Sequence, residues 1–191
     1  MKTIRLHPGR ERSLLRRHPW IFDSAIAKGG GDPGETVRVE SHDGRFLAWA
    51  AFSPQSRIRA RAWSFDEAQR IDAAFFAAAC ARAIGVRSRF DIRSDGVRLV
   101  HGESDGLPGL IVDRYAETLV AQFTSAGAER WKSVIVDALL RETGLEISVE
   151  RVEREHLGRH APRHDLRTAA HALSVPHQRR GRLHRRCPGA P

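Results

Sequence analysis

A change of composition near residue 150 limits how much of this chain can build a hydrophobic core. Residues 1–150 hold 22 basic and 20 acidic side chains, whereas residues 151–191 hold ten Arg, three acidic residues and no Phe, Trp or Tyr. A segment with high net charge and few large apolar residues cannot bury enough surface to offset the backbone entropy lost on folding. We therefore expect residues 1–150 to fold and residues 151–191 to form a disordered basic tail.

The role of this tail stays open between two interpretations. It could act as a basic arm that neutralises phosphates, or it could have no evolved role. Runs of Arg, His, Ala, Pro and Gly are typical of a GC-rich gene translated out of frame, and the coding DNA would test that origin.

Several function classes find no support in the sequence. No apolar run approaches the roughly 20 residues that span a bilayer, and the first 20 residues lack the pattern of a secretory signal, so we expect a cytoplasmic protein without a membrane partner. Cys80 and Cys187 are too few for a disulfide framework or a zinc site. Neither a P-loop nor a nucleophile elbow is present. We predict no catalytic, cofactor-binding or metal-binding residue in this chain.

Residues 1–72 have the pattern of a small β-rich domain with a short helix. Short apolar runs alternate there with Gly, Pro and Asp turn signals. Residues 35–39 and 45–52 flank an Asp-Gly turn and predict a hairpin. A helix is expected over 10–18, with Leu14 and Leu15 facing inward and Pro19 ending it.

Residues 73–150 predict a second unit, of α/β type. An Ala-rich helix over about 73–85 places Cys80 in the core. Strands are then expected over 97–101, 110–114 and 118–123, followed by a helix over 128–142 and a strand over 145–149. The expected fold class is therefore α+β, with a small β domain before a small α/β domain.

Two groups of arginines could contact a polyanion. The strand over 56–63 has side chains that alternate between two faces, so three arginines share one face, and four more lie on the predicted N-terminal helix. The strand face could bind phosphates or be a solvated surface with acidic partners nearby, and the sequence leaves these even. Together with Trp20 and Trp63, which could stack on unpaired bases, the arginines indicate RNA binding. The predicted RNA-contacting residues are Arg10, Arg12, Arg16, Arg17, Arg57, Arg59 and Arg61.

Three stretches of residues 1–150 resemble a known family: GRERSLLRRHPWIF at 9–22, SRIRARAW at 56–63 and GESDGLPGLIVDRY at 102–115. They look like the N-terminal half of bacterial large-subunit ribosomal RNA methyltransferases that modify carbon 5 of cytosine. The resemblance implies that residues 1–72 form a PUA domain, a β pseudo-barrel that binds RNA, and that residues 73–150 form the small α/β domain. In the family a Rossmann-like domain follows, which binds S-adenosylmethionine and carries the catalytic Cys.

That catalytic domain is not recognisable in residues 151–191, so we expect the chain to bind large-subunit rRNA but to be inactive alone, without S-adenosylmethionine. Methylation at carbon 5 needs a thiolate beside a bound methyl donor, and Cys187 stands in the Arg/His-rich segment. Two alternatives remain. A second chain could supply the catalytic domain of a split methyltransferase, or the chain could be a non-functional fragment that exposes an apolar face. Oligomeric state is not readable from the sequence.

Overall fold

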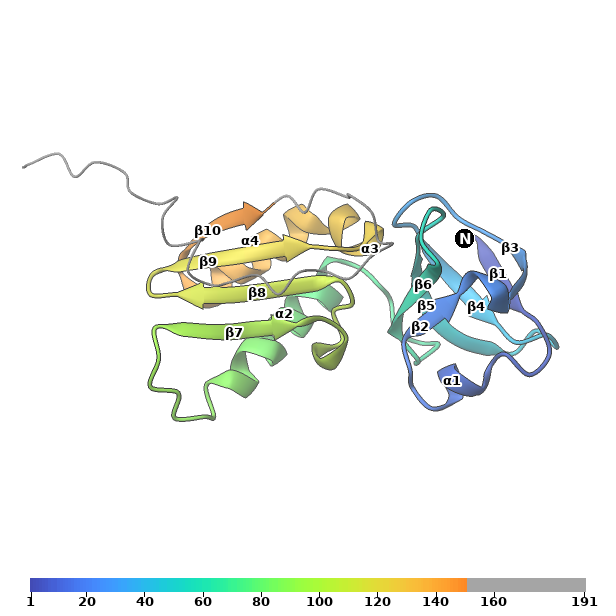
Figure 1. The fold of residues 1–191 in the computed structure, drawn as a ribbon, viewed down its shortest axis with the longest axis horizontal. Helices are drawn as coiled ribbons and strands as arrows, with labels where there is room; N and C mark the ends of the chain where they lie inside the picture. The colour runs from blue at the N-terminus through green and yellow to red at the C-terminus, as the bar shows by residue number, and fades with distance from the viewer. Residues whose placement is uncertain (151–191) are drawn as a thin grey trace, which may run out of the picture. The chain divides into compact units, whose positions relative to one another are not determined.

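A computed structural model describes residues 1–150 of the chain (Figure 1). The elements are β1 (Thr3–Leu6), α1 (Arg12–Leu15), β2 (Trp20–Phe22), η1 (Asp23–Ala25), β3 (Ile26–Gly29), β4 (Thr36–Glu40), β5 (Phe46–Phe52), β6 (Ile58–Ser64), α2 (Ala73–Arg87), β7 (Gly96–His101), η2 (Gly102–Asp105), β8 (Leu110–Tyr115), β9 (Thr118–Phe123), α3 (Ala126–Arg130), α4 (Lys132–Thr143) and β10 (Glu146–Glu150). The mixed α+β class predicted from the sequence is confirmed. The predicted tail lies outside the described residues.

The first sheet has six strands in the order β2-β6-β5-β4-β1-β3. β4 and β5 form the predicted hairpin, with Gly44 at φ 87° in its turn, a conformation that favours glycine. β6 continues this antiparallel meander, and β1 joins it in parallel beside β4. Small and β-branched residues, among them Val37, Ala48 and Ala60, fill the core of the sheet.

The N-terminal helix is shorter than the sequence predicts. α1 covers only Arg12–Leu15, because Arg17 takes the left-handed conformation at φ 63° and its backbone N–H turns back to the carbonyl of Leu14. Leu14 is buried, but Leu15 is 67% exposed. The prediction that both leucines face inward is therefore wrong for Leu15, since a single helical turn has room for one inward leucine.

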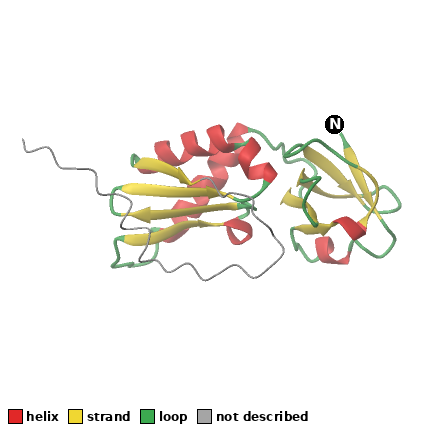
Figure 2. Ribbon diagram, turned by 45° about the horizontal axis from the view of Figure 1, so that its top comes forward, coloured by secondary structure: helices red, strands yellow, loops and turns green. Residues whose placement is uncertain are grey.

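The second sheet has the order β10-β9-β8-β7, with β10 parallel to β9. Helices α2 and α4 pack against one face of this sheet (Figures 1 and 2). α2 begins with Asp72 as its N-cap, whose side chain accepts from the N–H of Phe75. The single helix predicted over 128–142 is divided at Trp131 into α3 and α4.

The two sheets share one hydrophobic cluster. Ala51 of β5 and Trp63 of β6 belong to the core built by Phe76 and the helices beside the second sheet. The Trp63 and Phe76 rings meet edge to face at 5.1 Å. The described residues thus form one compact unit, and the domain boundary between 72 and 73 stays a prediction.

Apolar side chains also remain on the surface of residues 73–150. The exposed large ones are Val86, Phe90, Ile92, Tyr115 and Leu140. Apolar residues that are exposed singly are normal on a protein surface, so the hypothesis of a non-functional fragment with an exposed apolar face stays a prediction. No helix among residues 1–150 is long and apolar enough to cross a membrane.

Candidate nucleic-acid interface

The segment around α1 presents four exposed arginines. Arg10, Arg12, Arg16 and Arg17 all lie at the surface, because the turn before the helix and the left-handed residue after it leave only Leu14 pointing inward. The Arg17 guanidinium lies over the Phe65 ring, 5.2 Å from its centroid. Within residues 1–150, no carboxylate oxygen lies within 4 Å of the guanidinium nitrogens of Arg10, Arg12 or Arg16. These cations are therefore available to an external anion.

The three arginines near β6 differ in how far they are covered. Arg57, just before the strand, is exposed and has no acidic partner among the described residues. The Arg59 side chain is 26% exposed and lies 3.7 Å from a carboxylate oxygen of Asp23. The Arg61 side chain is only 14% exposed. The exposure of the arginine side chains thus falls from Arg57 to Arg61, and we call the Arg57 side the open end and the Arg61 side the covered end of β6.

The Arg61 side chain points toward η2, the short helix between β7 and β8. Its Nε lies 3.9 Å from Oε1 of Glu103 in η2, and its Nη1 donates to the carbonyl of Ile58. Burial lowers the pKa of the Arg61 guanidinium, and the charge of Glu103 acts in the opposite direction. Arginine stays protonated despite such a shift, so Arg61 is a charged side chain already facing one carboxylate.

Aromatic side chains border the exposed arginines. The rings of His18, Trp20 and Phe22 follow one another edge to face, with centroids 5.4 and 6.4 Å apart, and Phe22 is 47% exposed. Sequence reasoning missed Phe22, although strand alternation around the buried Ile21 places it on the face of Trp20. Trp63, predicted beside Trp20 as a stacking residue, is instead 6% exposed and belongs to the core. That prediction is wrong, because the residues that cover Trp63 come from distant sequence.

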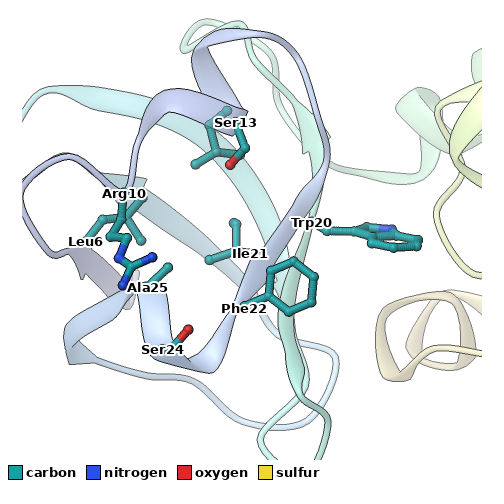
Figure 3. A pocket seen from close by; sticks show the side chains of 9 residues that line it. Leu6, Arg10, Ser13, Trp20, Ile21, Phe22, Ser24 and Ala25 are labelled. Atoms are coloured by element: carbon teal, nitrogen blue, oxygen red, sulfur yellow. The ribbon is translucent and has the colours of Figure 1, made fainter.

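A small pocket lies between α1, β2 and η1 (Figure 3). Figure 3 shows the side chains of Arg10, Ser24 and Phe22 among those that line the pocket. Such a set offers a cation, hydroxyl groups and a ring face, which are the groups that contact phosphate and unpaired bases. The lining residues are Leu6, Arg10, Ser13, Leu14, Trp20, Ile21, Phe22, Ser24 and Ala25.

Residues 1–150 contain no group of three or more His, Cys, Asp or Glu side chains that could hold a metal ion. Cys80 is fully buried in α2, and burial raises the pKa of its thiol to about 12. A thiol with that pKa is almost entirely protonated at neutral pH. Cys80 is therefore a core residue, as the Ala-rich helix predicts.

Known proteins resemble this chain in sequence and in fold. Residues 4–65 match the PUA-like domain family. Proteins named ribosomal RNA large subunit methyltransferase I are 51% identical over 143 residues in Shewanella frigidimarina and 47% identical over 138 residues in Citrobacter koseri. These matches cover 72% and 70% of this chain, but 36% and 35% of those proteins. The chain thus spans about a third of the length of these relatives.

Two solved structures share the fold at 15% identity. One is described as a SAM-dependent methyltransferase from Streptococcus mutans, with a TM-score of 0.67 over 78% of this chain and 41% of that chain. The other, described as a methyltransferase complexed with SAH, gives 0.68 over 78% and 40%. By sequence, this chain is therefore related to the ribosomal RNA large subunit methyltransferases over about a third of their length, and its residues 4–65 match the PUA-like domain family.

Proposed function

We propose that this chain binds ribosomal RNA through a surface on its PUA-like domain. The surface comprises the α1 segment, the exposed rings of His18 and Phe22 and the open end of the β6 segment. Its direct contacts are Arg10, Arg12, Arg16, Arg17, Arg57 and Arg59, with Arg61 at its covered edge. The observation that carries the proposal is that Arg10, Arg12, Arg16, Arg17 and Arg57 are exposed and, among residues 1–150, have no acidic partner, beside the exposed rings of His18 and Phe22.

The chemistry of this surface suits unpaired RNA. Arginines position the backbone by forking onto phosphate oxygens, and aromatic rings stack on bases that are not in a helix. The names of the relatives favour large-subunit rRNA as the partner. This binding would serve a methyltransferase that uses S-adenosylmethionine, in the cytoplasm where bacterial rRNA lies.

Methyl transfer itself does not fit residues 1–150. The pocket beside α1 has an arginine but no carboxylate, whereas nucleotide ribose hydroxyls are usually held by an acid. Carbon-5 methylation of cytosine also needs a thiolate, and Cys80 is a buried thiol with a raised pKa. We therefore assign RNA binding to these residues and derive no catalytic step from them.

The test is RNA affinity of the full chain at two salt concentrations, with large-subunit rRNA fragments. Replacing Arg10, Arg12, Arg16 and Arg17 together by Gln should lower affinity at low salt and reduce the salt slope by about three units, near 0.7 for each lost contact with single-stranded RNA. The control replaces Arg82, Arg89, Arg93 and Arg141 by Gln, which are exposed elsewhere and remove the same charge. Equal losses in both variants would show that only net charge matters, and would overturn the proposed surface.

A second arm tests stacking independently of charge. Phe22→Ala should weaken binding to single-stranded rRNA fragments by about tenfold, within the range measured for loss of one base–aromatic stack. Its thermal stability should change little, because Phe22 is half exposed. Unchanged affinity would remove the aromatic side of the surface from the proposal.

A further inference from the structure

The loop that precedes β8 reaches the edge of the proposed RNA-binding surface. Trp20 and Arg61 lie opposite each other in the β2–β6 register. Oε1 of Glu103 accepts from Trp20 Nε1 at 2.8 Å and lies 3.9 Å from Arg61 Nε. One carboxylate from residues 73–150 thus faces a ring and a cation that both belong to residues 1–72.

The position of Glu103 is fixed by its own loop. Asp105 lies two residues further on, and its two carboxylate oxygens accept hydrogen bonds from the Arg87 guanidinium at 2.5 and 2.7 Å. Asp105 also accepts from the backbone N–H of His101 at 2.6 Å. Leu107, at the end of the loop, is fully buried. Paired, planar contacts of this kind hold the Asp105 side chain in one geometry and so anchor the loop that carries Glu103, while the hydrogen bond from Trp20 Nε1 directs the Glu103 carboxylate.

We propose that Glu103 limits the RNA-binding surface by withholding Arg61 and Trp20 from RNA. Its carboxylate oxygen lies 3.9 Å from Arg61 Nε, where it pairs with the charge of this arginine in the place of a phosphate oxygen. Arg57, just before the same strand and without a carboxylate within 4 Å among residues 1–150, stays open to RNA. The inference rests on the proposed RNA-binding function and adds where that surface ends.

The experiment compares Glu103→Gln with the unchanged full chain, using single-stranded large-subunit rRNA fragments. Glutamine keeps an oxygen that can accept from Trp20 and removes only the charge. Affinity should rise about two- to fivefold, the scale of one partly exposed ion pair, and the salt slope should steepen by about 0.7. Glu117→Gln makes the same charge change in the turn at the far end of β8, about 17 Å from the loop at strand spacing, and should change little.

Arg61→Gln tests whether Glu103 affects RNA binding through Arg61 or only through its own negative charge. Alone, it should leave affinity nearly unchanged, and combined with Glu103→Gln it should abolish the gain. A gain that survives in the Arg61→Gln background would overturn the inference, because Glu103 would then act only through its field.

A spectroscopic readout completes the test without relying on affinity. The chain has four Trp, and Trp20→Phe identifies the indole N–H resonance of Trp20. RNA should leave that resonance in place in the unchanged chain and shift it in Glu103→Gln, because Trp20 lies opposite Arg61 in the β2–β6 register and a phosphate that reaches Arg61 would lie beside it. A shift of equal size in both would contradict the inference.

The outcomes also distinguish this inference from the proposed function. If the unchanged chain binds RNA and Glu103→Gln does not bind more tightly, the inference fails and the proposed function stands. If only Glu103→Gln binds, the proposed function fails for the unchanged chain, and the inference, which rests on that function, fails with it. If neither binds, both fail.

Discussion

The two ends of strand β6 carry the same residue pattern and meet different surroundings. At the beginning, Arg57 is exposed, with no carboxylate within 4 Å among residues 1–150. At the end, Arg61 faces Glu103 and Trp63 is buried against Phe76. Strand alternation decides which side chains share a face, but residues outside the strand, such as Phe76 and Glu103, decide whether that face is open. A row of arginines in a sequence therefore shows where a polyanion could bind only after its cover is known.

Trp63→Ala removes the buried ring at the covered end of β6 and has the largest expected effect on stability. The ring is almost fully buried and its Nε1 has no partner in the part of the chain that the structure describes, so its loss removes packing rather than a hydrogen bond. We expect about 3–5 kcal/mol less free energy of unfolding, measured by denaturant titration. Trp63→Phe should lose less. A change below about 1 kcal/mol would show that the cover on this end of β6 is loose.

Gly127→Ala tests the same end from the opposite side. A Cβ at Gly127 would overlap the Ala51 side chain and the Trp63 ring, so α3 would have to move away from the sheet. We expect a loss of about 1–3 kcal/mol in the free energy of unfolding. Gly85→Ala is the matched control, because its Cβ would meet nothing within 4 Å. It should stabilise α2 by roughly 0.5–1 kcal/mol, and equal effects at both sites would contradict the packing shown at Gly127.

Arg57→Gln and Arg61→Gln compare the two ends directly in RNA binding. Arg57→Gln should reduce the salt slope by about 0.7, since its side chain is open to phosphate. Arg61→Gln should leave the slope nearly unchanged, because Glu103 already faces that guanidinium. Titrations of each variant at several salt concentrations measure both. Equal losses would erase the distinction between the open and covered ends.

Asp23→Asn probes the middle of the strand and has the smallest expected effect. Asp23 and Arg59 are 3.7 Å apart, and the Asp23 side chain is half exposed. Exposed pairs of this kind contribute about 0–1 kcal/mol, so the melting temperature should barely change. RNA affinity should rise, but less than in Glu103→Gln. A larger rise would move the boundary of the surface from Arg61 to Arg59.

Local patterns predicted the local parts of this fold. The Asp-Gly turn fixed the β4–β5 hairpin, and the alternation around Ile58 and Ala60 fixed the faces of β6. β1 and β3 were missed, because strands of only four residues carry too little periodicity to stand out. The break at Trp131 was missed for a related reason, since the apolar spacing continues across it.

The candidate site was predictable as a set of residue types and not as an arrangement. Exposed arginines near α1 follow from composition, because a single helical turn cannot bury them. The different status of Trp20 and Trp63 could not be predicted, since both are tryptophans on short strands. Trp63 packs against Phe76, whereas Trp20 Nε1 donates to Glu103, and both partners come from elements outside the first sheet.

The strand order of the first sheet has a consequence for how the chain folds. The first 29 residues supply β2 to one edge of the β4–β5–β6 meander, and β1 and β3 to the other. Hairpins close in microseconds, whereas pairings across longer loops are slower to form. We therefore expect the meander to assemble first and the N-terminal strands to dock later on both edges. Residues 1–29 would then be among the last to become native, and the arginines of α1 would reach their final positions only at the end of folding.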